Sequence, residues 1–94
     1  MTNQGDMIKK IFKINNKYGL HARPAALLVK TAGRFKSDIK VAKDGYVVNG
    51  KSLMGVMTLA AEPGSEIEVT VEGKDEQQAM EAIEELISKN FFEE

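Results

Sequence analysis

The sequence predicts an α+β fold in which one four-stranded antiparallel sheet is covered on one face by three helices. Stretches with a hydrophobic period of two alternate with stretches of helical period, in the order strand, helix, strand, strand, helix, strand, helix. The strands are apolar on one side only, and such a sheet needs helices on that side alone. The 94 residues, 43% of them hydrophobic, suffice for one domain, residues 1–94, with a small core.

The first predicted element is a strand over residues 8–14. Ile8, Phe12 and Ile14 share one of its faces, although Lys10 falls in the same phase. The polar residues that follow the strand are typical of a loop.

A helix is predicted from Ala22 to about Gly33. Pro24 is tolerated in a first turn, and a glycine such as Gly33 can end a helix. Four apolar residues recur at helical spacing: Ala25, Leu28, Val29 and Ala32. This spacing leaves three residues that point elsewhere: Ala26, Leu27 and Lys30.

A hairpin and a short helix come next. The pair Asp44-Gly45 is a strong signal for a two-residue turn, and it joins β-prone runs at residues 38–43 and 46–49. Ser52 is a suitable N-cap for a helix over residues 53–59, although Gly55 lowers its helix propensity.

The last two elements are a strand and a helix. Residues 66–72 alternate between polar and apolar without a fault, which predicts a half-exposed strand. Asp75 is predicted to cap the final helix. The apolar stripe of that helix consists of Ala79, Met80, Ile83, Leu86 and Ile87.

The composition excludes several classes of protein. There is no cysteine and only one histidine, which argues against a disulfide framework, a zinc site or any other metal centre, and no cofactor is predicted. Residues 1–6 hold no apolar signal-peptide core, and no stretch is long enough to span a bilayer. We therefore expect a cytoplasmic protein that does not insert into a membrane.

The net charge of −1 hides an uneven distribution. Residues 1–60 carry eleven basic and three acidic side chains, whereas residues 61–94 carry two basic and eleven acidic ones. Two solvated faces of one domain would account for most of these charges. A basic first part would also attract acidic proteins or phosphorylated donors. Nucleic acid fits less well, because the lysines are scattered and few aromatic residues are available for stacking.

The only histidine, His21, is a candidate phosphate acceptor. It stands at the start of the first predicted helix, where unpaired N–H groups and the helix dipole favour an anion. The N–H groups of Ala22 and Arg23 can face a phosphate there, whereas Pro24 has none to offer. The Arg23 guanidinium adds a planar fork of donors suited to phosphoryl oxygens.

An alternative function is suggested by residues 45–52. They match G-x-x-x-x-G-K-[ST], the pattern of a nucleotide-binding P-loop that ends in Lys51 and Ser52. The context argues against a P-loop, because Tyr-Val-Val favours a strand and Asp44-Gly45 favours a hairpin. We interpret the match as a coincidence, although a small nucleotide-binding protein stays as an alternative.

Two separated motifs carry a family resemblance. The segment G-L-H-A-R-P-A around His21 and the segment K-S-L-M-G around Ser52 resemble the HPr family, the histidine phosphocarriers of the bacterial phosphoenolpyruvate-dependent phosphotransferase system. The resemblance runs from about Met7 to the end of the last helix. It implies the family's fold, an open-faced β-sandwich of four antiparallel strands covered by three helices.

The resemblance also implies a relay in place of an enzymatic activity. His21 would accept a phosphoryl group from phosphorylated Enzyme I and donate it to the IIA components of sugar permeases. Phosphoryl transfer depends mainly on positioning and charge neutralisation, which His21 and Arg23 can supply.

The family docks its partners on a surface beside the phosphate acceptor. Residues of two helices are expected to form that surface here, on the expectation that the helix N-termini converge near the phosphate: Ala26, Leu27, Lys30, Leu53, Met54 and Met57. Besides its role as an N-cap, Ser52 is implied as a site of regulatory phosphorylation. Its partners would be HPr kinase/phosphorylase and a catabolite-control regulator.

Two further alternatives stay open. The tail of residues 90–94 holds Phe91 and Phe92 among acidic residues, and it resembles the nitrogen-related branch of the family, whose carriers regulate without feeding a sugar permease. A small α+β binding or adaptor module without phosphoryl chemistry is the other alternative.

Overall fold

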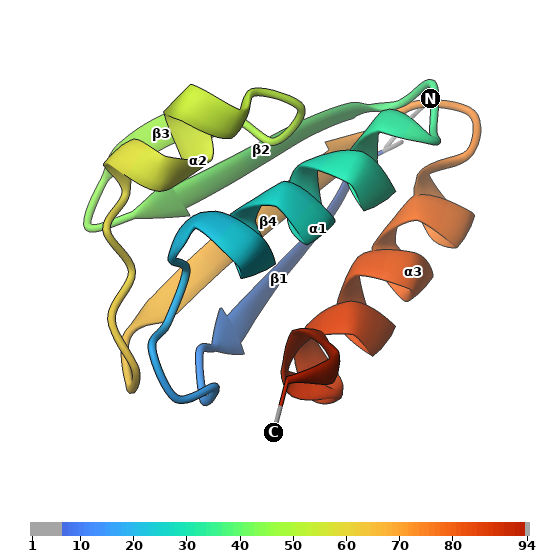
Figure 1. The fold of residues 1–94 in the computed structure, drawn as a ribbon. Coiled ribbons are helices and arrows are strands. Elements are labelled where there is room, and N and C mark those ends of the chain that lie inside the picture. Colours follow the sequence, from blue (N-terminus) through green and yellow to red (C-terminus); the bar gives the residue numbers. More distant parts are fainter. Residues whose placement is uncertain (1–6, 94) are drawn as a thin grey trace.

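The structure, a computed structural model, describes residues 7–93 and confirms the predicted order of elements. Expectations about residues 1–6 lie outside this range. The helices α1, α2 and α3 lie on one face of a sheet with the strand order β1-β4-β2-β3, in which every pair is antiparallel (Figure 1). The strands are β1 (Met7–Lys13), β2 (Asp38–Lys43), β3 (Tyr46–Asn49) and β4 (Glu66–Glu72). The helices are α1 (Ala22–Gly33), α2 (Leu53–Thr58), α3 (Glu76–Ser88) and a short 3₁₀ turn, η1 (Asn90–Phe92).

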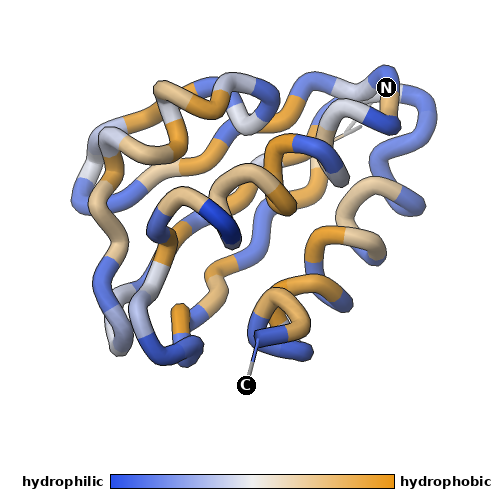
Figure 2. Tube along the Cα trace, viewed as in Figure 1, coloured by the Kyte–Doolittle hydropathy of each residue, from blue (hydrophilic) through white to orange (hydrophobic). Residues whose placement is uncertain are grey.

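The core lies between the sheet and the helices. Hydrophobic segments occur on the strands and on the parts of the helices that cover them (Figure 2). The alternation in β4 buries Ile67, Val69 and Val71, as the period of two predicts. The stripe predicted for α3 is buried throughout. The faces that the hydrophobic pattern marks therefore turn toward the core, with Ile8, Phe12 and Val29 only partly buried at its edge.

The opening strand departs slightly from its predicted bounds. Strand β1 ends at Lys13, and Ile14 is fully buried just beyond it. Lys10 shares a face with Ile8 and Phe12 without entering the core, because its ammonium group reaches Glu84 of α3 at 2.8 Å. A lysine can cover apolar surface with its aliphatic stem while its charge stays in water, which explains why it breaks the pattern without breaking the strand.

The hairpin between β2 and β3 is the predicted two-residue turn. Asp44 and Gly45 both have positive φ, 53° and 83°, and Lys43 pairs with Tyr46 across the turn. Two positive φ values characterise the turn that matches the twist of a hairpin. The turn thus fixes the register of the β2/β3 edge.

The predicted capping role of Asp75 is wrong in its detail. Asp75 is the N-cap residue of α3, but its side chain makes no capping bond to that helix. Its carboxylate instead accepts hydrogen bonds from the Ser37 hydroxyl (2.5 Å) and from the N–H groups of Lys36 and Ser37 (2.8 and 2.9 Å). Asp75 therefore ties the start of α3 to the segment that leads into β2.

These hydrogen bonds make the stability of the fold sensitive to acid. The Ser37 hydroxyl, followed by the N–H of Lys36, lowers the pKa of Asp75 from 3.8 to about 2. A carboxyl group with a lowered pKa in the folded state contributes stability at neutral pH, and this contribution is lost as the pH falls from about 4 to about 2. We expect Asp75→Asn to lower the urea midpoint at neutral pH, by a margin that shrinks through this window.

Asp38→Asn is the matched control, since Asp38 is an exposed carboxylate at the start of β2. Its urea midpoint should follow that of the wild type across the same pH range. A constant difference between Asp75→Asn and the wild type from neutral pH to pH 2 would contradict the assignment.

Two further observations bear on the class of protein. Among residues 7–93, no helix combines the length and the apolar character that crossing a membrane requires. Within the same range, no group of three or more histidine and acidic side chains is placed to hold a metal ion.

Candidate functional site

His21 is positioned by the loop between β1 and α1. The N–H of Leu20 donates to the carbonyl of Ala61 (2.8 Å), and the amide of Asn16 donates to the carbonyl of Gly19 (2.7 Å). Gly19 has a φ of +70°, and a Cβ at this position would overlap the carbonyl oxygen of Ala61. Only glycine satisfies both conditions. The loop therefore fixes the point at which α1 begins.

His21 is the N-cap residue of α1 and has extended backbone angles. Its carbonyl accepts from the N–H of Ala25 (3.0 Å), and its side chain makes no capping bond. The N–H groups of Ala22 and Arg23 precede this first helical bond, while Pro24 is buried and carries no N–H. An anion beside the imidazole would thus meet two backbone donors and the positive end of the helix dipole.

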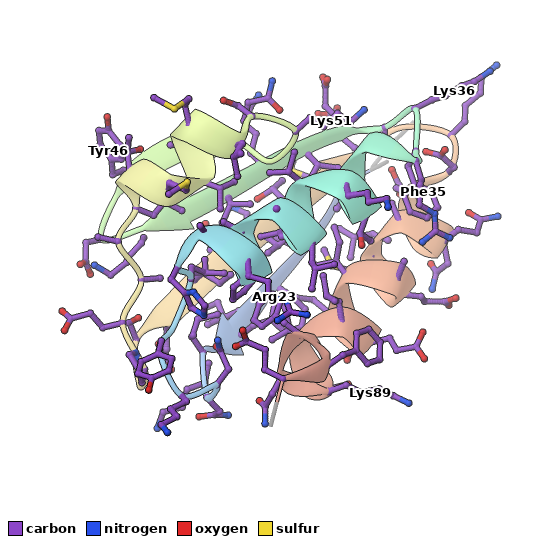
Figure 3. All side chains as sticks on the ribbon, in the orientation of Figure 1. Arg23, Phe35, Lys36, Tyr46, Lys51 and Lys89 are labelled. Carbon is purple, nitrogen blue, oxygen red and sulfur yellow. The ribbon has the colours of Figure 1, made fainter. Side chains whose placement is uncertain are left out.

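Arg23 lies on the side of α1 that faces α3 and the C-terminal turn (Figure 3). Together with Lys17, Tyr18, Phe92 and Glu93 it lines a depression of about 330 Å³. The Tyr18 ring packs edge-on against the His21 imidazole, with 5.8 Å between the ring centres. The depression therefore lies beside the histidine, and two of its lining residues are cationic.

Sequence reasoning missed one residue of this site, Glu93. One oxygen of its carboxylate lies 3.2 Å from Nε2 of His21, and the other accepts from the Asn16 amide at 2.9 Å. Phe91 gave the available signal, because it follows Ile87 by four residues and so extends the apolar stripe of α3. That continuation indicates a chain end that folds back against the core.

Ser52 has the capping role that the sequence predicts. It is the N-cap of α2, and its hydroxyl oxygen accepts from the N–H of Gly55 at 3.0 Å. Oxygen side chains at this position satisfy one of the free N–H groups of a helix start.

The expectation that the two helix N-termini converge is wrong. Lys51, just before α2, donates to the carbonyl of Phe35, which lies beyond the C-terminal end of α1 (2.7 Å). Helix α2 therefore begins toward the end of α1 and runs back toward its start (Figure 1). The hairpin explains this direction. Strand β2 begins soon after α1 ends, and the antiparallel strand β3 returns to near the start of β2, so α2 begins near the end of α1.

The candidate docking residues on α2 are exposed. Leu53 and Met57 expose 41% and 40% of their surface and Met54 exposes 75%, whereas Val56 is the buried residue of the helix. The exposure predicted for these three side chains is confirmed.

The candidate docking residues on α1 adjoin the site. Ala26, Leu27 and Lys30 line a second depression together with Arg23. Phe91 and Phe92 close this depression from the other side. The structure thus joins the α1 residues to the C-terminal turn, while the α2 residues lie on the neighbouring helix, which packs against α1.

The residues that match a P-loop do not form an open loop. Residues 46–49 are strand β3, Gly45 belongs to the hairpin turn, and the Lys51 ammonium group is engaged with Phe35. A P-loop needs free backbone N–H groups around the phosphates. This geometry supports the interpretation of the match as a coincidence.

Comparisons with known proteins agree with one another. Residues 8–89 match a family model described as the PTS HPr component phosphorylation site. The "Phosphocarrier protein HPr" of Treponema pallidum is 51% identical over 88 residues, which is 94% of this chain and 100% of that protein. The "HPr-like protein Crh" of Halalkalibacterium halodurans is 52% identical over 88% of this chain and 99% of that protein.

Solved structures show the same likeness. The crystal structure of HPr-C-His from Thermoanaerobacter tengcongensis superposes with a TM-score of 0.90 and 47% identity, covering 93% of this chain and 98% of that one. The solution structure of Crh, described as the Bacillus subtilis catabolite repression HPr, is 44% identical with a TM-score of 0.63, covering 85% of this chain and 95% of that one.

Proposed function

The chain belongs to the HPr family of phosphotransferase-system phosphocarriers, and from this premise we propose that His21 accepts a phosphoryl group from phosphorylated Enzyme I and donates it to IIA components of sugar permeases. The observation that carries the proposal is the position of the only histidine, beside Arg23 and ahead of two backbone N–H groups that precede the first helical hydrogen bond. Family members named phosphocarriers match nearly the whole chain.

The chemistry of the site is suited to a relay. The phosphoryl group would form a bond to a ring nitrogen, while its oxygens would accept from Ala22 and Arg23. A phosphoramidate keeps a high transfer potential because protonated nitrogen is a good leaving group, so the group can pass on to a second protein. The His21 side chain is 38% exposed, which leaves room for a partner's histidine to approach.

The direct test uses the wild-type protein with phosphoenolpyruvate and Enzyme I. Phosphorus NMR should show a phosphohistidine signal that disappears on treatment with acid. Absence of that signal, with an active Enzyme I verified on a known carrier, would refute the proposal. A perturbed ATP spectrum in its place would favour the nucleotide-binding alternative.

The proposed docking surface consists of the exposed residues of α1 and α2 named above. Ala26, Leu27 and Lys30 adjoin Arg23, so a protein bound there would reach the phosphate. Flexible methionine side chains such as Met54 and Met57 suit a surface that must fit several partners.

Two classes of IIA protein, one for each branch of the family, are candidate acceptors of the phosphoryl group. A sugar-permease IIA component is the first candidate, and a regulatory, nitrogen-related IIA protein is the second, suggested by the aromatic and acidic C-terminal residues. Incubation of the phosphorylated protein with each class of IIA protein distinguishes them, because only the true acceptor should take up the phosphate quickly.

Ser52 is proposed as a site of regulatory phosphorylation by an HPr kinase, and a catabolite-control regulator is the expected reader. The similarity to Crh, described as a catabolite repression HPr, supports a regulatory role of this kind. Because α2 begins away from His21, a phosphate on Ser52 would act on docking near Leu53 and Met54, with no direct contact to the imidazole. Its charge would oppose the binding of an apolar partner surface.

We expect Ser52→Ala to remove labelling by a cognate HPr kinase and ATP, measured as acid-stable phosphate. Ser52→Asp keeps a capping oxygen and adds a charge, so it should slow phosphorylation of His21 by Enzyme I roughly tenfold, which corresponds to about 1.4 kcal/mol. Thr58→Ala removes the other hydroxyl of the α2 segment, which bonds the Gly55 carbonyl, and should retain full labelling. Equal labelling of Ser52→Ala and the wild type would contradict the assignment.

A further inference from the structure

The carboxylate of Glu93 is held between two partners that lie far from it in the sequence. Its Oε2 is 3.2 Å from Nε2 of His21, and its Oε1 accepts from Nδ2 of Asn16 at 2.9 Å. Asn16 is itself buried and donates also to the carbonyl of Gly19 (2.7 Å). The same loop that positions the histidine therefore also positions the carboxylate.

The C-terminal turn brings Glu93 to this place with little freedom. Phe91 is buried in the core with 1% of its surface exposed, two residues before Glu93. Asn90, Phe91 and Phe92 all have left-handed backbone angles, with φ of 51°, 57° and 57°. The N–H of Glu93 closes the turn on the carbonyl of Asn90 (3.0 Å). Residues 90–93 thus form an anchored turn in which the Glu93 side chain is only 18% exposed.

We infer that Glu93 is a positioning residue for phosphoryl transfer, which holds the proton on Nε2 of His21 and leaves Nδ1 free to bond the phosphorus. This inference rests on the function proposed above. An imidazole nitrogen that donates to a carboxylate keeps its proton, and the other nitrogen then carries the free lone pair. The side chain of His21 makes no capping bond to α1, so that lone pair is not used by its own helix.

The role of Glu93 follows from where charge develops. In the transfer, the Nδ1 lone pair forms a bond to phosphorus as the bond from phosphorus to the donor's nitrogen breaks. The Nε2 proton stays in place, so the imidazole ring gains a positive charge, which the carboxylate stabilises. When the phosphoryl group leaves for an acceptor, the electron pair returns to Nδ1 and the ring becomes neutral again. No proton needs to move in either direction.

The same carboxylate also repels an incoming phosphate, and the geometry decides which effect prevails. Glu93 lies at the Nε2 edge of the ring, whereas the phosphoryl group would be bound at Nδ1, so the ring separates the two anions. Coulomb energies fall with distance, and contact with the ring proton is the closer interaction. Arg23 from α1 and Lys17 from the preceding loop line the same depression and offset the negative charge, and Tyr18 is a further ionisable residue of its lining.

The test compares Glu93→Ala and Glu93→Gln with the wild type. Enzyme I and phosphoenolpyruvate supply the phosphate, and initial rates are measured in both directions of transfer. Glu93→Ala should lower both rates roughly tenfold, about 1.4 kcal/mol. Glu93→Gln should recover part of the loss, because its carbonyl oxygen still accepts from Nε2 without the charge. Glu85→Gln, which removes an exposed carboxylate on α3, should leave both rates unchanged.

A second readout separates this role from a merely structural one. Hydrolysis of a phosphohistidine is fastest while the ring keeps its proton, so the rate falls as the pH rises through the loss of that proton. Without the carboxylate beside the ring proton, this fall should occur at a lower pH in Glu93→Ala than in the wild type. A melting curve of Glu93→Ala that matches the wild type would show that this change comes from the lost carboxylate and not from unfolding.

These measurements distinguish a failure of the proposed function from a failure of the inference about Glu93. Failure of the wild type to form phosphohistidine would refute the proposed function itself. If the wild type is phosphorylated and Glu93→Ala has the same transfer rates and pH profile, only the inference about Glu93 is overturned. Faster transfer in Glu93→Ala would also overturn it, because Glu93 would then compete with phosphate for the site. An equal slowing in Glu85→Gln would overturn it as well, because that result would indicate a general effect of charge.

Discussion

Replacing His21 with alanine is expected to abolish acid-labile phosphorylation by Enzyme I while leaving the fold intact. His21 is the only histidine in the chain, so no second imidazole can take over its role. Its side chain is partly exposed and makes no capping bond to α1. The contact that it loses, with the carboxylate of Glu93, joins partly exposed groups and contributes at most about 1 kcal/mol.

The measurement combines phosphorus NMR after incubation with phosphoenolpyruvate and Enzyme I with a thermal melt of the same variant. The phosphohistidine signal should be absent, and the melting curve should remain close to that of the wild type. His21→Gln is the companion variant, because its amide can still contact Glu93 but cannot form a stable phosphorylated adduct. Undiminished acid-labile labelling of either variant would contradict the assignment of His21 as the phosphate acceptor.

The fold could be predicted largely because its signals are local. The alternation of Ile67, Val69 and Val71 marks a strand whatever lies beside it, and Asp44-Gly45 specifies a turn through its own backbone preferences. Observed element bounds lie within about one residue of those expected, which is the uncertainty inherent in defining helix and strand ends. Because the strands are apolar on one side only, the helices were expected to cover that face of the sheet alone.

The errors arise where a residue's partner is distant in the sequence. Asp75 is a good N-cap by residue type, but Ser37 and the N–H of Lys36 compete successfully for its carboxylate from another part of the chain. Likewise, Lys51 and Phe35 reveal that α2 runs against α1. Local propensity carries no information about the direction in which a helix returns over a sheet.

In the candidate site, too, the residues of a local motif could be predicted and those with distant partners could not. His21 and Arg23 stand in one short motif at a helix start, so the residue types and their spacing suffice to single them out. Glu93 lies 72 residues from His21, and Asn16 lies 77 residues from Glu93. No periodicity links positions so far apart, and an acidic residue near a chain end is usually solvated. The burial of Phe91, together with the hydrogen bond from Asn16, makes the position of Glu93 definite.

The second large effect is therefore expected from Phe91, whose replacement with alanine should destabilise the protein by about 3 kcal/mol. The ring is among the largest fully buried side chains, and its removal leaves a cavity next to α3. Three successive left-handed residues cost roughly 1 kcal/mol each, and burial of this ring is what offsets that cost. The value lies at the lower end of the range for buried phenylalanine because the freed turn can relax.

Phe92→Ala provides a control of matched chemistry. Phe92 has the same left-handed backbone angle but exposes 66% of its surface, so its loss should change stability by no more than about 0.5 kcal/mol. Urea denaturation of both variants measures the difference. A change of less than about 1 kcal/mol for Phe91→Ala would mean that the turn is not anchored as the structure has it. The contact between Glu93 and His21 would then lose its physical basis, because that contact needs the turn to be held before phosphate arrives.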